Sequence, residues 1–220
     1  GAATGLGYRR PDSDAPSDRY RLWEVPGASH ISNDLGATTM TEQRDLAELE
    51  GISLAALPPT GCTHQQLING AWVGVPGTIS PNAYPFGDVA DAAFEDLTNW
   101  VNHGTPPPHS ARIETTSSGS VARDRFGNAR GGLRTPFVDV PTATYSPADS
   151  VAHDTDLAGL CVLMGYGTPF GRAKLQGLYP SHADYVARVE READALVRQG
   201  FWLQSDAARV VAQAARAEVP

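Results

Sequence analysis

The sequence predicts a protein of mixed strands and helices, in which short strands, a hairpin and many turns precede a helical C-terminal third. Glycine and proline are both frequent, with 22 and 17 residues in a chain of 220, and this favours turns and long loops over a helical bundle. The last third instead has apolar residues at helical spacing between capping residues. A hydrophobic share of 41% and a charged share of 19% are typical of a globular protein with a buried core.

The first predicted element is a strand at Tyr20–Val25, with Leu22 packed inside and Trp23 as a second core candidate. It belongs to the stretch "RYRLWEVPGASH", in which it runs into a Pro-Gly turn, two small residues and His30. An imidazole on such an uncrowded loop can point into a cleft, and it can take up and return a proton near neutral pH. On spacing alone, an ordinary surface or core histidine is the simpler interpretation of His30.

The central part of the chain predicts two helices and a hairpin. Thr41–Glu50 is a short helical candidate, and Asp88–His103 carries apolar residues on one helical face before a glycine and three prolines end it. The Asp, Gly and Asn of Asp124–Asn128 favour a tight reversal, so we expect a β-hairpin there. The segment that follows, "TPFVDVP", contains two prolines, which predict that it is extended, at a sheet edge or outside regular pairing.

Two further helices are predicted near the C-terminal end. Ser181 occupies an N-cap position with Asp184 three residues on, an apolar stripe follows, and Gly200 terminates the pattern. Ser205 then opens a last helix, "DAARVVAQAARA".

Charge and hydropathy argue against two kinds of partner. The formal net charge is −8, the sequence pI is about 5.1, and Lys174 is the single lysine. A nucleic-acid surface needs clustered lysine and arginine, so none is expected. The sequence also lacks a run of about 18 apolar residues, so no membrane span is expected.

Neither a metal nor a cofactor is expected. The histidines other than His30, at positions 64, 103, 109, 153 and 182, are scattered without the spacing of metal ligands. The stretch "GYGTPFG" places a proline and a phenylalanine where a phosphate-binding loop needs open backbone amides. Cys62 and Cys161 predict either two buried thiols or one long-range disulfide.

The sequence offers acids but no serine nucleophile, since it contains no Gly-x-Ser-x-Gly elbow. Asp12, Asp14 and Asp18 precede the predicted strand, the chain order of a Ser–Asp–His arrangement, but their "PDSDAPSD" context is typical of a solvated turn. Asp139 lies between apolar neighbours, and Arg134 is as good a partner for it as a histidine would be.

Four segments, taken in order, resemble the C-terminal half of a poorly characterised, mostly bacterial group of α/β-hydrolase-domain proteins. These segments are "RYRLWEVPGASH", "SVARDRFGNARGGLRTPFVDVPTATY", "MGYGTPF" and "LQGLYPSHADYVARVEREADALVRQGFWLQSDA". The resemblance implies an α/β-hydrolase fold whose last sheet strand is Tyr20–Val25 and whose triad histidine is His30. Residues 1–35 would then form the last strand and the histidine loop, and residues 36–220 the helical and hairpin decoration that covers the sheet and shapes the cleft.

The same resemblance implies that the nucleophile and the acid lie in the N-terminal half of the same protein, upstream of Gly1. The chain is then expected to be a fragment, a processed subunit paired with that half, or a portion presented separately. The implied activity is that of a serine hydrolase on a small carboxylic ester or related acyl bond, with His30 as general base and then general acid. The alternative is a non-catalytic binding or structural module that retains the hydrolase shape. The sequence leaves open an exported, periplasmic or cytoplasmic location.

Overall fold

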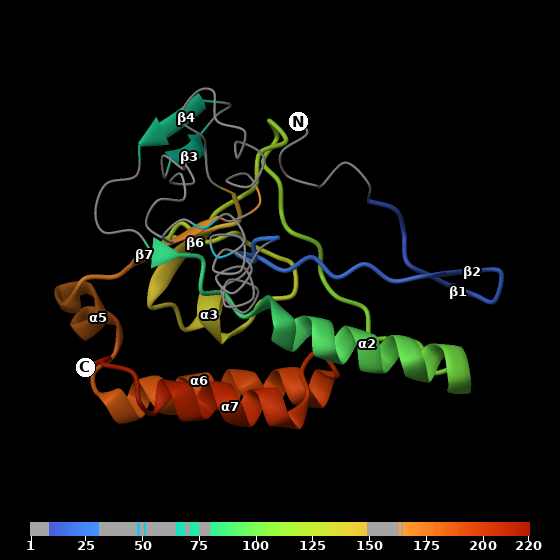
Figure 1. Ribbon diagram of the computed structural model, residues 1–220. Coiled ribbons are helices and arrows are strands. Elements are labelled where there is room, and N and C mark those ends of the chain that lie inside the picture. Colours follow the sequence, from blue (N-terminus) through green and yellow to red (C-terminus); the bar gives the residue numbers. More distant parts are fainter. Residues whose placement is uncertain are drawn as a thin grey trace. The chain divides into compact units, whose positions relative to one another are not determined.

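The computed structural model describes residues 9–30, 48, 51, 65–68, 71–74, 80–148, 163 and 165–220, and every structural statement below refers to these residues (Figure 1). The chain divides into two compact units. Unit 1 comprises Gly1–Pro26, Phe86–Thr144 and Phe170–Pro220, and unit 2 comprises Gly27–Pro85 and Tyr145–Pro169. Apart from residue 48, the predicted helix at Thr41–Glu50 lies outside the described residues, and so do both cysteines.

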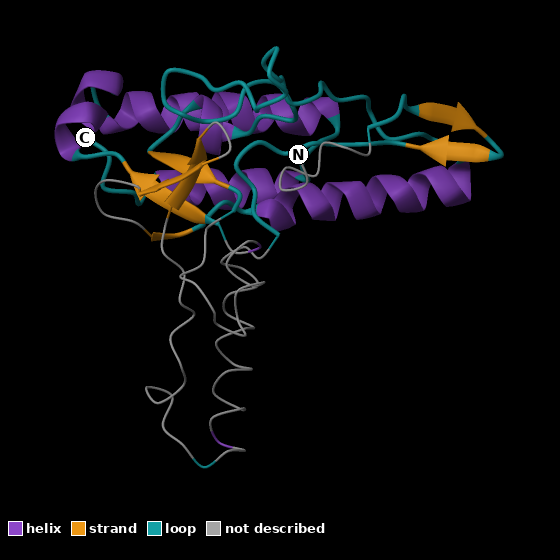
Figure 2. Cartoon of the chain, turned by 90° about the horizontal axis from the view of Figure 1, so that it is seen from above, coloured by secondary structure: helices purple, strands orange, loops and turns teal. Residues whose placement is uncertain are grey.

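The helices described in full are drawn in purple in Figure 2, and by residue range they all belong to unit 1. They are α2 (Phe86–His103), α3 (Pro136–Asp139), α5 (Arg172–Leu178), α6 (His182–Gln199) and α7 (Gln204–Ala214). The prediction for Asp88–His103 is confirmed by α2, which buries Val89, Ala92 and Trp100. Its remaining large apolar side chains are exposed instead, Phe94 by 70% and Leu97 by 50% of their surface. Only one side of this helix therefore faces the core.

Helix α6 confirms the predicted caps at both ends. The Ser181 hydroxyl accepts a hydrogen bond from the Asp184 backbone N–H at 3.2 Å, which satisfies one of the free donors of the first turn. Gly200 ends the helix in the left-handed conformation, with a φ of 82°. Helix α7 begins two residues earlier than predicted, because Leu203 rather than Ser205 is the residue that precedes the first turn.

The core of unit 1 lies where α6 and α7 pack against each other and against α2 and the 133–140 segment. Trp23 packs against this core from the N-terminal segment, with its ring edge-on to Phe201 at a centroid distance of 5.1 Å. Its indole N–H donates to the Pro108 carbonyl at 2.8 Å, so the buried polar end has a partner. The buried residues of this core are Val89, Leu133, Val140, Tyr179, Tyr185, Val189, Ala193, Leu196, Phe201, Trp202, Ala207, Val210, Ala214 and Val219.

The predicted strand at Tyr20–Val25 is wrong in its bounds. Between residues 9 and 30 the described strands are β1 (Ser13–Ala15) and β2 (Asp18–Tyr20), which form an antiparallel hairpin, and residues 21–30 lie outside any strand. The reason lies in the partners of its backbone: the Leu22 N–H bonds the Asp12 carboxylate, and the Leu22 carbonyl accepts from the Arg112 side chain. Side chains therefore satisfy groups that a neighbouring strand would otherwise pair.

The predicted reversal at Asp124–Asn128 is confirmed, and a second reversal precedes it at 116–120. Together they arrange three extended pieces in a closed ring of backbone hydrogen bonds. The Glu114 N–H donates to the Arg130 carbonyl, the Arg130 N–H to that of Ala122, and the Ala122 N–H to that of Glu114, at 2.8, 2.9 and 2.8 Å. The segment is thus more compact than the simple hairpin that the sequence predicts.

The "TPFVDVP" segment is not extended, because Pro136–Asp139 forms the short helix α3. Proline at the first helical position has its backbone angle preset for a helix and lacks an N–H that would need a partner. The Thr135 carbonyl accepts from the N–H groups of Val138 and Asp139 at 3.0 Å, and the Arg134 side chain donates to the Val138 carbonyl at 2.8 Å.

Unit 2 contains a separate antiparallel hairpin of β3 (Gln65–Ile68) and β4 (Ala71–Gly74). A small sheet has the strand order β5 (Ser80–Pro81), β7 (Tyr166–Pro169) and β6 (Ala143–Ser146), the last of which starts in unit 1. Among the helices described, none has the length and apolar composition that a bilayer crossing requires.

Candidate functional site

His30 lies on a loop of unit 2, directly after the predicted Pro-Gly turn. The turn residues Pro26 and Gly27 are buried, Ser29 is 4% exposed, and His30 itself is exposed. No hydrogen bond or ion pair joins the His30 ring to another residue that the structure describes. The loop is therefore anchored in the interior up to the residue that carries the imidazole.

A buried asparagine holds this loop in place. Asn82 is 1% exposed, and its amide nitrogen donates to the Gly27 carbonyl at 2.8 Å and to the Ser146 carbonyl at 3.0 Å. Its side-chain oxygen accepts from the Tyr84 N–H at 2.9 Å. Both donors of the amide and one acceptor site are therefore used, and they fasten the turn before His30 to the end of β6.

Two glycines allow the close approach of backbone around this loop. Gly27 has a φ of 89°, and a Cβ there would lie 3.0 Å from the Tyr145 Cβ and 3.4 Å from the Tyr84 ring. Gly165 has a φ of 58°, and a Cβ there would lie 2.3 Å from the Ser146 carbonyl oxygen. The left-handed backbone and the lack of space each favour glycine at both positions.

Asn82, Tyr84 and Tyr145 belong to this arrangement, although the sequence did not single them out. The two tyrosine rings meet edge to face at 5.6 Å and pack beside Gly27. Asn82 lies 55 residues from the carbonyl it binds, so no local pattern could have found it. The one local signal is the sequence Asn82-Ala83-Tyr84, in which a side chain can bond the backbone two residues on.

The four aspartates considered as partners of His30 are each paired with an arginine instead. Asp14 binds Arg21 at 2.6 Å, and Asp18 binds Arg10 at 2.9 Å. Asp139 accepts from Arg134 at 2.5 Å, which is the alternative that the sequence left open. Asp12 is the most enclosed of the four, with 9% of its side chain exposed.

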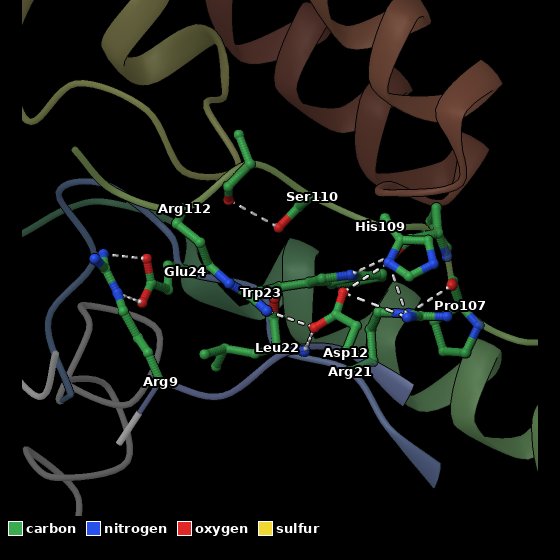
Figure 3. A network of polar contacts seen from close by, with 12 residues as sticks. Arg9, Asp12, Arg21, Leu22, Trp23, Glu24, Pro107, His109, Ser110 and Arg112 are labelled. Carbon is green, nitrogen blue, oxygen red and sulfur yellow. Dashed lines mark hydrogen bonds and ion pairs between the residues drawn. The ribbon is translucent and has the colours of Figure 1, made fainter. Parts of the chain in front are cut away.

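Asp12 is the centre of an ion-pair cluster in unit 1 (Figure 3). One carboxylate oxygen accepts from Arg112 at 2.5 Å, and the other lies 2.8 Å from His109 Nδ1 and 3.3 Å from Arg21. Burial acts to raise the pKa of Asp12, but hydrogen bonds from Arg112 and His109 outweigh it and hold the pKa below its ordinary value. The carboxylate therefore stays ionised at neutral pH.

The pair of Asp12 and His109 has the residue types of a catalytic aspartate–histidine pair, in which the carboxylate orients the imidazole. Arg21 lies 2.9 Å from the same His109 nitrogen, and this nitrogen cannot donate to Asp12 and accept from Arg21 at once. The neighbouring Ser110 hydroxyl donates to the Ala111 carbonyl at 3.2 Å. The cluster accordingly fastens the N-terminal segment to residues 107–113, and we assign it a structural role.

Two further histidines lie among the described residues, His103 and His182. His103 is exposed at the end of α2, and the His182 ring nitrogens lie 3.0 and 3.1 Å from the carbonyls of Val219 and Ala215. His64 and His153 lie outside the described residues. Within the described ranges, no three histidine, cysteine or acidic side chains are grouped as metal ligands would be.

Comparison with known proteins identifies the family. The model of a family described as "alpha/beta hydrolase domain" matches residues 2–212. No curated protein and no solved structure matches the chain. The match spans nearly the whole chain and supports a hydrolase-type function in general terms. The predicted fold class is thereby confirmed, and this chain belongs to the alpha/beta hydrolase domain family.

Proposed function

We propose that the protein is part of a serine hydrolase that cleaves a carboxylic ester or a related acyl bond of a small molecule. His30 acts first as general base and then as general acid. The serine and its acid partner come from polypeptide outside these 220 residues, in the N-terminal half of the same protein. Membership of the hydrolase family supports the reaction class, and the exposed imidazole on an anchored loop supports the choice of His30.

The observation that supports the proposal is that the His30 ring is exposed while the loop that carries it is fixed in place. The loop is fixed by Asn82 and by the packing of Gly27 against two tyrosines, whereas the imidazole is exposed and has no partner among the described residues. A general base needs both properties, because it must be held in position and its acceptor nitrogen must be available.

In the proposed reaction, the His30 imidazole takes the serine proton as the serine oxygen attacks the acyl carbon. The resulting imidazolium returns that proton to the departing alcohol, which leaves an acyl-enzyme. A water molecule then enters, and His30 removes its proton as the water oxygen attacks the acyl carbon. The imidazolium returns this proton to the serine oxygen as the serine ester bond breaks, which releases the acid product and the free serine. Each proton that His30 accepts is given back, so the imidazole ends each cycle neutral.

The assignment of the serine to other polypeptide rests on the sequence and on the ion pairs. No Gly-x-Ser-x-Gly elbow occurs in the 220 residues. Each of the four aspartates considered as acid partners is paired with an arginine, so none of them is available to orient His30.

The test is ester hydrolysis by the full-length protein and its His30→Ala and His30→Gln variants, with p-nitrophenyl acetate and butyrate as substrates. We expect kcat to fall by about 10²–10⁴-fold, the usual contribution of a general acid–base group. His103→Ala is the matched control, because His103 is exposed at the end of α2 and has no place in the proposed reaction. Unchanged turnover in both His30 variants would refute the assignment of His30.

A fluorophosphonate probe separates the proposal from the alternative of a non-catalytic module. Only a serine activated by a base reacts with such a probe at a useful rate. We expect covalent labelling of the full-length wild type and of His103→Ala, and a much lower rate for His30→Ala. A wild type that is not labelled, despite a native circular dichroism spectrum, would support the non-catalytic module.

A further inference from the structure

Unit 1 contains a second feature of chemical interest, a cavity of about 160 Å³ far along the sequence from His30. Its lining residues come from the 124–128 reversal, the end of α3, the end of α5 and the first half of α6. Two arginines, one aspartate and several apolar side chains line it, among them Arg125, Phe126, Asp139, Leu178, Tyr179 and Arg188.

The cations of this cavity are held in place over aromatic rings. The Arg125 guanidinium carbon lies 4.6 Å from the centre of the Phe126 ring, and that of Arg188 lies 5.7 Å from the centre of the Tyr179 ring. Lys174 is outside the cavity lining, and its ammonium lies 5.5 Å from the centre of the Phe126 ring and 3.4 Å from that of the Phe170 ring. Such contacts orient a cation without neutralising its charge.

Carboxylates leave much of this charge uncompensated. Among the described residues, neither Arg125 nor Lys174 has a carboxylate at ion-pair distance. Arg188 binds Asp184 one turn earlier at 2.8 Å, an exposed pair that uses one of its guanidinium nitrogens. The aspartate of the cavity, Asp139, is bound to Arg134 at 2.5 Å. Arg134 is also bound to Asp124 at 3.1 Å, so the positive charge without a carboxylate at ion-pair distance comes from Arg125 in the cavity lining and from Lys174 close to it.

The walls between the cations are apolar or neutral. Tyr179 is 3% exposed, and its hydroxyl donates to the Pro141 carbonyl at 2.9 Å. Burial raises the pKa of Tyr179 well above its ordinary value, so this side chain stays uncharged and does not repel an anion. Phe126 and Leu178 supply hydrocarbon surface beside it.

We propose that this cavity binds a small organic carboxylate, such as an aromatic or short aliphatic acid. The carboxylate is held by Arg125 and Arg188, whose planar guanidinium groups match its two oxygens, and the hydrocarbon part packs on Phe126, Leu178 and Tyr179. The volume fits this class of ligand, because an apolar protein cavity of about 150 Å³ is known to take up benzene. This inference does not rest on the role of His30.

The test is a titration of the full-length protein with benzoate, followed by calorimetry and by NMR. We expect Kd in about the millimolar range, as befits a ligand of this size, and weaker binding as the salt concentration rises. The Arg125→Gln/Arg188→Gln double variant should raise Kd at least tenfold. Arg191→Gln, which changes an exposed arginine of α6 outside the cavity, should leave Kd unchanged.

Two further probes separate recognition of a carboxylate on a hydrocarbon body from binding through the ring alone or the charge alone. Benzyl alcohol has the ring without the charge, and inorganic phosphate has the charge without the ring, so both should bind at least tenfold more weakly than benzoate. Equal binding of either probe would overturn the proposal, as would an equal loss in Arg191→Gln or the absence of benzoate binding. Circular dichroism of each variant confirms that the comparison is made between folded proteins.

Discussion

Asn82 is the residue on which the position of His30 depends most directly. Its side chain makes three hydrogen bonds in a site that is 1% exposed. Loss of the amide would leave the carbonyls of Gly27 and Ser146 and the Tyr84 N–H buried without that partner. Each such buried group costs about 1–3 kcal/mol when no water replaces the lost partner.

We therefore expect Asn82→Ala to lower the free energy of unfolding by at least about 2 kcal/mol and to lower ester turnover together with it. Urea denaturation measures the first effect and a p-nitrophenyl ester assay the second. Asn102→Ala is the matched control, because Asn102 is exposed on α2. Equal stability of the two variants would show that Asn82 does not anchor the loop.

Asp12 predicts how stability depends on pH. Its pKa in the folded protein lies below the ordinary value, because the opposing effect of burial is outweighed by hydrogen bonds from Arg112 and His109. The ionised carboxylate of Asp12 is therefore more favoured in the folded state than in the unfolded state, and this difference stabilises the fold. This contribution is present at neutral pH, and it is lost as the pH falls from about 4 through the lower pKa of the folded state.

We expect Asp12→Asn to lower the free energy of unfolding at pH 7 and to flatten its decline below about pH 4. Denaturant titrations from pH 3 to pH 7 measure both effects. Asp14→Asn serves for comparison, since half of the Asp14 side chain is exposed and such pairs contribute about 0–1 kcal/mol. An Asp12 variant with the acid sensitivity of the wild type would contradict the role given to the cluster.

At the scale of elements, the helices α2, α6 and α7 were predictable because their signals are local. The cap at Ser181, the apolar stripe and the terminating Gly200 all lie within α6 or next to it, and the structure has each in its predicted role. The strand at Tyr20–Val25 was not predictable, because strand pairing depends on partners elsewhere in the chain. Here the partners of Leu22 are the side chains of Asp12 and Arg112.

The "TPFVDVP" segment shows a different limit. Proline disfavours both a central strand and a helix interior, but it is well suited to the first helical position. An extended segment is expected when proline is considered only as a residue that disfavours central strands and helix interiors. Pro136 instead occupies the first helical position, where proline is favoured. Arg134 then donates to the Val138 carbonyl at the end of this single turn.

Replacing Gly200 and Gly177 by alanine is expected to change the free energy of unfolding in opposite directions. Gly200→Ala should lower the free energy of unfolding by about 1 kcal/mol, because the residue has a φ of 82° while its nearest neighbours leave room for a Cβ. Gly177→Ala should raise it by about 0.4–1 kcal/mol, because Gly177 lies within α5 with nothing close to the added atom. Thermal denaturation of both variants checks the pair, and changes of the same sign would contradict this account.

At the scale of the whole molecule, the resemblance to α/β-hydrolase-domain proteins predicted more than any pattern of spacing did. It gave the family, which the family model confirms, and it singled out His30 among six histidines. The division into residues 1–35 and 36–220 stays a prediction. The support of the His30 loop could not be foreseen, because Asn82 and Tyr145 reach it only through the folding of unit 2.

The exposed side of α2 has a practical consequence for anyone who handles this protein. Phe94, Leu97 and Val101 repeat at intervals of three and four residues, so they form one exposed apolar ridge along the second half of the helix. Sulfate and other salts that are excluded from the protein surface strengthen the hydrophobic association of such a ridge. Ammonium sulfate should therefore bring the protein out of solution, or onto a phenyl resin, earlier than its eight excess negative charges would suggest.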